Sequence, residues 1–197
     1  MTDIKKIYFT VSSAPFLIII LVIAIILMVC ESSSADSSIT PVSSYSDFKA
    51  PFSDNSAYQI SSPFGDRVDP ATQKILFHNG IDLKAKEGTE IVASASGKVW
   101  KTGYETGGLG NYVKLEHDVN GVKYYTAYGH MKDNSIVVHD GEMVAQGQKL
   151  GVIGMSGYAT GIHVHFMIMT PNCTYNKADV KDPTSIITAD QEQRKNN

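Results

Sequence analysis

The stretch that most constrains this chain is Gly161-Ile162-His163-Val164-His165-Phe166, which places two histidines one residue apart inside an apolar run ending at Met169. β-Branched and aromatic residues dominate the run, so we predict a strand. Alternate side chains on a strand share a face, and His163 and His165 therefore point the same way while their apolar neighbours point into a core. Two imidazoles on a packed strand suit a metal site or a catalytic pair; the alternative is two histidines on a solvated face.

Residues 58–187 are predicted to form one all-β domain. Short runs of β-forming residues alternate there with Gly, Asn and Asp turns, a pattern typical of antiparallel strands with close turns. Asn120-Gly121 between two alternating runs predicts a hairpin that pairs Tyr112–His117 with Val122–His130. The remaining expected strands are Ile81–Leu83, Glu90–Ala93, Gly97–Trp100, Ile136–Val138, Gln148–Ile153 and His163–Met169. A weak likeness between Gly88–Ala93 and Gly141–Ala145 indicates two related halves packed as a compact β-sandwich.

The N-terminal part predicts a membrane anchor. Residues 14–30 carry no charge, and the uncharged span is long enough to cross a bilayer, with Lys5 and Lys6 before it and acidic residues after it. The positive-inside rule then places residues 1–13 in the cytoplasm and everything after residue 30 outside it. A cleaved signal peptide is one alternative, and a lipoprotein signal ending at Cys30 is another, although Val29 is not the small residue that such a signal requires.

Two polar segments flank the predicted domain. Residues 31–57 hold ten serines and show no apolar periodicity, so we expect a flexible linker. Residues 188–197 are polar and are expected to be a disordered tail. The chain has two cysteines, Cys30 and Cys173, too few for a cysteine-based metal site, and Cys173 is expected to have no functional role. The net charge is −3 and no basic run occurs, which argues against a nucleic-acid partner.

The other histidines add candidates for a metal site. His78 and Asp82 are four residues apart, and on a strand they share one face while apolar residues anchor the other. Together with one histidine of the His163/His165 pair they offer two nitrogens and one oxygen, a set that zinc accepts with a fourth position open for water. His130 and the other member of the pair are then available to move protons or to stabilise an oxyanion. The two remaining histidines, His117 and His139, lie beside turn residues and are expected to be solvated.

Four blocks of the sequence resemble the lysostaphin-type zinc metallopeptidases in order and spacing. They are Ser62-Pro63-Phe64-Gly65-Asp66-Arg67, His78-Asn79-Gly80-Ile81-Asp82, Tyr128-Gly129-His130-Met131 and the run from Gly157 to Phe166. The resemblance covers roughly residues 58–170. It implies a β-sandwich with an open groove across one sheet, and an enzyme that cuts peptide bonds in peptidoglycan.

The resemblance also assigns roles. It implies that His78, Asp82 and His165 bind one zinc ion and that His130 and His163 assist catalysis. The expected reaction is attack on an amide carbon by zinc-activated water, with the two histidines moving protons and stabilising the oxyanion. The chain departs from the family pattern at Ile162 and Met167, neither of them a ligand, and it lacks the tyrosine that some members place shortly before the first ligand.

Two functions from other classes are alternatives. An inactive relative could serve as a wall-binding scaffold or as an activator of another hydrolase, although the complete set of site residues argues against it. The glycine-punctuated β pattern also resembles biotinyl or lipoyl carrier domains, for which Met131-Lys132 is the one faintly suitable site.

Overall fold

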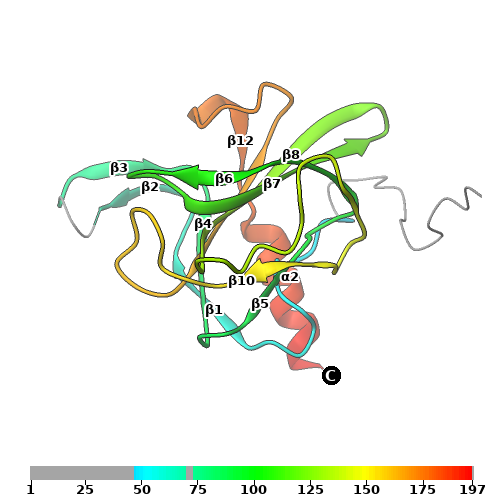
Figure 1. The fold of residues 1–197 in the computed structure, drawn as a ribbon. Coiled ribbons are helices and arrows are strands. Elements are labelled where there is room, and N and C mark those ends of the chain that lie inside the picture. The colour runs from blue at the N-terminus through cyan, green and yellow to red at the C-terminus, as the bar shows by residue number, and fades with distance from the viewer. Residues whose placement is uncertain (1–46, 70–72, 197) are drawn as a thin grey trace, which may run out of the picture. The chain divides into compact units, whose positions relative to one another are not determined.

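The computed structural model describes residues 47–69 and 73–196, which form a mostly β domain (Figure 1). The strands are β1 (Tyr58–Ser62), β2 (Gly65–Val68), β3 (Ile75–His78), β4 (Ile81–Ala85), β5 (Glu90–Val92), β6 (Gly97–Glu105), β7 (Gly110–Val119), β8 (Val122–Met131), β9 (Met143–Val144), β10 (Lys149–Val152), β11 (Val164–Met169) and β12 (Val180–Lys181). A 3₁₀ turn, η2 (Lys177–Asp179), and one helix, α2 (Thr184–Lys195), complete the described part.

One antiparallel sheet dominates the domain. Its strand order is β1-β4-β11-β8-β7-β6-β9, and β12 pairs with β11 to make eight strands. The β5–β10 and β2–β3 pairs are separate two-stranded sheets. Figure 1 shows β5 and β10 below β6 and β7, and their Ile91 and Leu150 share one core cluster with Val113 and Phe166. The predicted class of antiparallel β structure is confirmed, and the structure adds one helix. The expected two similar halves are not found among the described residues, because one sheet has eight strands and the other two have two each.

The predicted hairpin is confirmed. Strands β7 and β8 pair from Val119↔Val122 outward, and Asn120 and Gly121 connect them with φ values of 53° and 80°. Two consecutive positive φ angles define the type I′ turn, whose twist matches that of the flanking strands. The predicted strand Ile136–Val138 is wrong, because that segment is irregular and gives one backbone hydrogen bond, from Val137 N to Leu150 O at 3.0 Å.

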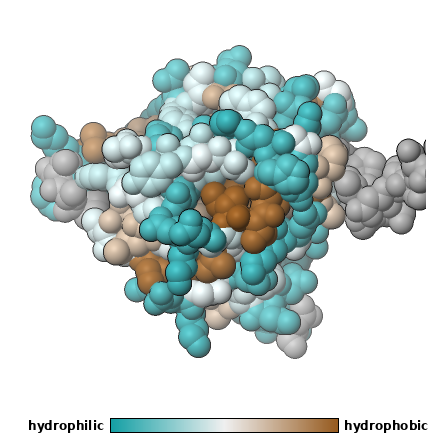
Figure 2. All heavy atoms as spheres, in the orientation of Figure 1, coloured by the Kyte–Doolittle hydropathy of each residue, from teal (hydrophilic) through white to brown (hydrophobic). Residues whose placement is uncertain are grey.

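Alternation along β11 separates two faces of the large sheet. Val164, Phe166 and Ile168 lie in the main core cluster, whereas Met167 and Met169 pack in a second cluster on the other face. His165 belongs to this second face, as period-2 geometry requires. The face of the domain seen in Figure 2 is mostly hydrophilic, with the largest group of apolar side chains near its centre and smaller groups toward the left.

The folded domain begins earlier than predicted. Phe48, Ala50 and Phe52 are at most 3% exposed and belong to the main core cluster, and Phe52 forms a β-bridge with Ile91. The linker prediction is therefore wrong at its C-terminal end, where three alternate apolar residues in a serine-rich stretch share one buried face. Residues 31–46 of that linker lie outside the described residues.

The predicted disordered tail is also wrong as far as residue 196. Helix α2 buries Ile186 and Ile187 in the core, and Asp190 accepts a 2.6 Å hydrogen bond from the Tyr58 hydroxyl. Arg194 forms an ion pair with Asp190 and donates to backbone oxygens of Phe52, Ser53, Asp54 and Ser56. Long-range polar contacts of this kind leave no periodic signal in a polar sequence.

His117 contradicts its prediction. Strand β7 continues past it to Val119, so the side chain faces the core and is fully buried. Its Nδ1 donates to the Ser96 carbonyl oxygen at 2.9 Å, and its Nε2 lies 2.8 Å from Thr126 Oγ1. His139 is exposed, as predicted.

The membrane-anchor prediction, residues 14–30, lies outside the described residues, as does Cys30. Within residues 47–69 and 73–196, no helix combines the length and the apolar character needed to cross a bilayer. Cys173 is a free cysteine that is partly buried.

Candidate metal centre

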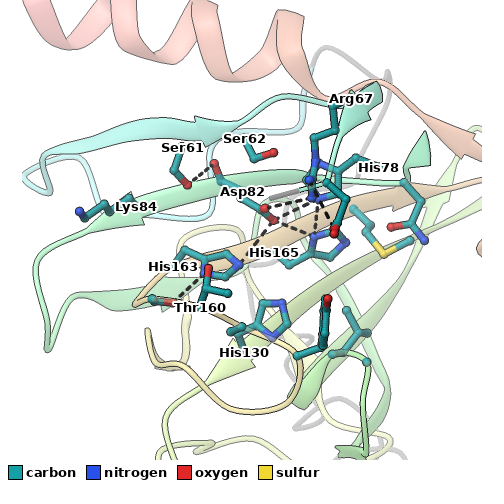
Figure 3. Close-up of a pocket in the computed structure, with 18 of the residues that line it drawn as sticks. Ser61, Ser62, Arg67, His78, Asp82, Lys84, His130, Thr160, His163 and His165 are labelled. Carbon is teal, nitrogen blue, oxygen red and sulfur yellow. Dashed lines mark hydrogen bonds and ion pairs between the residues drawn. The ribbon is translucent and has the colours of Figure 1, made fainter. Parts of the chain in front are cut away.

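Three neighbouring strands of the large sheet, together with the end of β3, bring the predicted site residues together. Asp82 on β4 pairs in register with His165 on β11, and His165 pairs with Gly129 on β8, one residue before His130. His78 ends β3 and His163 directly precedes β11. All five predicted side chains therefore converge on one pocket of about 670 Å³ (Figure 3).

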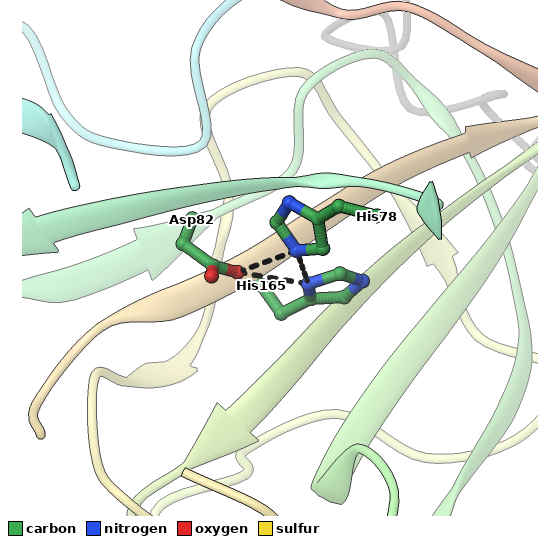
Figure 4. Close-up of side chains that lie close together, drawn as sticks. All are labelled: His78, Asp82 and His165. Carbon is green, nitrogen blue, oxygen red and sulfur yellow. Dashed lines mark hydrogen bonds and ion pairs between the residues drawn. The ribbon is translucent and has the colours of Figure 1, made fainter. Parts of the chain in front are cut away.

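His78, Asp82 and His165 form a tight triangle (Figure 4). Asp82 Oδ1 lies 2.9 Å from His165 Nδ1 and 3.2 Å from His78 Nε2, and the two nitrogens are 3.1 Å apart. Each of the three residues is at most 9% exposed. In the part of the chain that the structure describes, this is the one group of ligand-type side chains close enough to hold a metal ion.

The chemistry of these three atoms favours a bound cation. His78 Nδ1 lies 2.7 Å from the Pro63 carbonyl oxygen, which can only accept a hydrogen bond, so Nδ1 carries the proton. In the neutral imidazole Nε2 then presents a lone pair, and it faces a carboxylate oxygen and a second imidazole nitrogen. Lone pairs that converge in a buried space repel one another unless a cation or a proton lies between them.

The spacing and the donor types fit zinc. Bonds of about 2.0–2.1 Å place the ligand atoms of a tetrahedral zinc ion about 3.3–3.4 Å apart. The observed separations of 2.9–3.2 Å are within a few tenths of an ångström of that edge. Two histidines and one carboxylate are a ligand set of catalytic zinc sites, which keep a further position for water or substrate. The Pro63 carbonyl orients one of the candidate ligands.

Gly80 permits this close approach of strands. A Cβ at this position would lie 2.7 Å from His165 Nε2 and 2.6 Å from the Phe166 carbonyl oxygen, both too close for real atoms. Glycine is therefore required between His78 and Asp82 if His165 is to occupy its place.

Asp82 is held ionised. Burial opposes its charge, but the adjacent imidazoles of His165 and His78 outweigh burial and keep the pKa of this carboxyl far below its usual value. The site therefore offers a full negative charge to a cation at neutral pH.

His130 and His163 stand beside the triangle without belonging to it. The Nδ1 of His130 donates to the Ser156 carbonyl oxygen and that of His163 to the Gly161 carbonyl oxygen, each at 2.8 Å. In the neutral form of either ring, the proton on Nδ1 leaves Nε2 as a proton acceptor. Their ring centroids are 4.6 Å apart, and His163 Nε2 lies 3.6 Å from Asp82 Oδ1.

The backbone at His130 is strained. Its φ is +58°, a conformation that side-chain-bearing residues seldom adopt and that concentrates at functional sites. Burial, and then the neighbouring His163, lower the pKa of His130 to about 4. His130 is therefore neutral at pH 7 in the protein as described.

Sequence reasoning gave no role to several other pocket residues. Arg67, Glu105, Tyr158 and Tyr175 line the same pocket, and Tyr175 donates a 3.1 Å hydrogen bond to Glu105. Arg67 belongs to one of the motif blocks, so the sequence could have marked it as a candidate site residue. The others come from loops and strand ends whose convergence only the tertiary structure reveals.

Comparison with known proteins agrees with this geometry. The model of peptidase family M23 matches residues 76–180, more than half of the 197 residues. The chain is a member of peptidase family M23. The family predicted from the four motif blocks is thereby confirmed.

Three relatives illustrate the membership. The chain is 33% identical over 135 residues to the peptidoglycan DD-endopeptidase ShyA of Vibrio cholerae, covering 67% of this chain and 30% of the relative. A zinc-containing peptidase from Vibrio cholerae superposes with a TM-score of 0.57 at 32% identity, covering 69% of this chain and 39% of that one. The catalytic domain of lysostaphin from Staphylococcus simulans superposes with a TM-score of 0.57 at 28% identity, covering 66% of this chain and 92% of that domain. The chain thus spans about a third of the length of ShyA.

Proposed function

We propose that this M23 member is a zinc-dependent metalloendopeptidase that hydrolyses peptide bonds in the stem or cross-bridge peptides of peptidoglycan. The observation that carries the proposal is the convergence of His78, Asp82 and His165 on one buried point, with His130 and His163 beside it in the same pocket. The similarity to ShyA, a peptidoglycan DD-endopeptidase, supports the substrate class.

The proposed roles follow from the geometry. When zinc is bound by His78, Asp82 and His165, it supplies Lewis-acid activation of water and of the amide carbonyl. His163 would accept a proton from the attacking water, because its Nδ1 is bonded to the Gly161 carbonyl oxygen and its Nε2 lies 3.6 Å from Asp82 Oδ1. The same proton would then pass from His163 to the leaving amine, and His130, whose ring centroid is 4.6 Å from that of His163, lies close enough to take part in this transfer.

We also propose that residues 14–30 anchor the enzyme as a single pass in the cell membrane, with the catalytic domain outside the cytoplasm. The uncharged span and the lysines that precede it support this placement. Protease added to intact spheroplasts should remove residues 47–197 while sparing a short membrane fragment. A full-length chain that resists the protease until the membrane is lysed contradicts the orientation.

The test of the enzymatic proposal is muropeptide analysis. The purified full chain, loaded with zinc, is incubated with peptidoglycan sacculi, and the released products are identified by mass spectrometry. We expect peptide-bond cleavage that a chelator stops, that His163→Ala removes, and that His139→Ala, a change at an exposed histidine outside the pocket, leaves intact. Binding to sacculi without any product would instead indicate the wall-binding scaffold.

A further inference from the structure

Arg67 on β2 has unused hydrogen-bonding capacity beside the metal centre. Its Nε is buried and has no partner, the single such side-chain nitrogen or oxygen within residues 47–69 and 73–196. Its two terminal nitrogens lie 4.0 Å from Asp69 Oδ2 and 4.0 Å from Asp82 Oδ2. Those separations allow electrostatic attraction but are too long for hydrogen bonds, so both carboxylates hold the guanidinium without satisfying its donors.

The chain has one other arginine, Arg194, and its guanidinium has a purely structural role. Arg194 donates to Asp190 and to four backbone carbonyl oxygens, and it fastens α2 to the segment that precedes β1. Arg67 makes no comparable set of bonds and lines the pocket. An arginine fork with unused donors in a pocket matches a carboxylate, which it binds through two parallel hydrogen bonds.

The position of Arg67 specifies which carboxylate it can reach. Asp82 turns Oδ1 toward the two histidines and Oδ2 toward Arg67, so the guanidinium lies one carboxylate away from the point where the metal ligands converge (Figure 3). In a peptide substrate, the α-carboxyl carbon of the residue on the leaving side is only two bonds from the scissile nitrogen. That group is therefore the anionic part of a substrate nearest to the reacting amide.

We propose that Arg67 forms a subsite for the free α-carboxylate of the amino acid whose nitrogen is released. This inference rests on the proposed function and narrows its substrate class. The enzyme would favour amide bonds to an amino acid that ends in a carboxylate, as at the end of a stem peptide or at a cross-link to a diamino acid with a free carboxyl. It would disfavour amide bonds inside a continuous peptide, where no free carboxylate follows.

The test measures binding separately from turnover. The full chain carrying His163→Ala, loaded with zinc, is titrated in a calorimeter with diacetyl-L-lysyl-D-alanyl-D-alanine and with the C-terminal amide of the same peptide. A bidentate charge-assisted pair predicts about ten- to hundredfold tighter binding of the acid. Adding Arg67→Gln should make the two affinities equal, and Arg67→Lys should restore part of the preference.

Two controls separate a subsite from other effects. Lys84 is a second cation lining the pocket, and in Figure 3 it points away from Asp82, so Lys84→Gln removes the same charge and should keep the preference for the acid. Zinc affinity of the Arg67→Gln protein should stay within about tenfold, the lower end of the usual cost of losing a partner of a metal ligand, because the 4.0 Å contact with Asp82 is too long for a hydrogen bond. A larger loss of zinc affinity would show that Arg67 acts only by positioning the ligand Asp82.

The outcomes are decisive. Equal binding of acid and amide by the His163→Ala protein, or no measurable binding of the acid, overturns the subsite. So does an Arg67→Gln protein that loses zinc and weakens both peptides alike, since Arg67 would then be a positioning residue for Asp82. Failure of the wild-type chain to cleave sacculi rejects the enzymatic proposal by itself and leaves this binding comparison valid.

Discussion

Two regions of this domain each bury histidine, on opposite faces of the large sheet. On the core face, His117 has Nδ1 bonded to the Ser96 carbonyl and Nε2 beside Thr126 Oγ1, so both nitrogens are satisfied. On the pocket face, His78 has one nitrogen bonded to a carbonyl and directs the other at Asp82 and at His165. Burial alone therefore does not distinguish a structural histidine from a functional one; the partner of the second nitrogen does.

The largest expected effect is loss of the metal. Asp82→Ala removes the charged ligand and leaves two facing imidazoles, so we expect zinc binding to be lost and hydrolysis of sacculi to fall to background. Competition with a chromogenic chelator measures the zinc affinity. A variant that keeps stoichiometric zinc would show that the triangle is not the metal centre. His117→Ala is the matched histidine change and should retain zinc.

A smaller loss of activity is expected for a variant that still binds zinc but lacks the residue that transfers the proton. His163→Ala should retain zinc within a few-fold but reduce kcat by about 10²- to 10⁴-fold, the usual contribution of a positioned general base. Metal analysis and product release are measured on one preparation. Cleavage near the wild-type rate would contradict the role of His163 and leave His130 as the remaining candidate for the base.

The opposite pattern is expected on the core face. His117→Ala removes the partner of Ser96 and Thr126 and leaves a cavity beside Phe48, whose ring centroid is 5.0 Å from that of His117. We expect the free energy of unfolding to fall by about 2–4 kcal/mol, with zinc affinity unchanged. Urea denaturation gives the stability. A specific effect on zinc binding in the folded variant would show that the two regions are coupled.

The smallest expected effect is a pH dependence that arises on the core face. Burial lowers the pKa of His117 to about 4, and the Ser96 carbonyl and the Glu116 carboxylate only partly oppose it. The unfolded chain binds this proton near pH 6.5 and the folded chain does not, so stability is complete above that pH and declines as the pH falls toward 4, by at most about 1.4 kcal/mol per unit.

That component can be isolated by difference. The decline should be shallower in His117→Gln, which cannot titrate, than in wild type, when urea midpoints are compared at pH 7.0, 5.5 and 4.5. Parallel slopes in the two proteins would assign the acid sensitivity to other groups.

Much of the pocket could be predicted because its residues lie in short motifs with strand alternation. The spacing of His163 and His165 places both on one face of an extended segment, as predicted. The prediction that His78 and Asp82 share one strand is wrong, because His78 ends β3 and Asp82 lies on β4, and a bend at Gly80 brings them together instead. Arg67, Glu105, Tyr158 and Tyr175 could not be assigned in this way. They come from different strands and loops, and only their convergence makes them neighbours.

The errors in the fold share one cause. Phe48, Ala50 and Phe52 were hidden among serines, and the polar end of α2 is fixed by a contact of Asp190 with Tyr58, a residue 132 positions away in the sequence. The turn residue beside His117 predicts an exposed position, although β7 continues through it and pairs with β8. At both ends of the domain a long-range contact overrode the local composition, and at His117 strand pairing did.

The sequence by itself determined the antiparallel β class and the Asn120-Gly121 hairpin, because turn chemistry and side-chain alternation are local properties. It also offered His78, Asp82 and one of His163 and His165 as metal ligands, and the resemblance to a family chose His165. Only the tertiary structure decided where the domain begins and ends, which histidines have a nitrogen left for chemistry, and that Arg67 faces the same pocket as Asp82. These depend on strand order and register, which bring residues far apart in the chain within a few ångströms of one another.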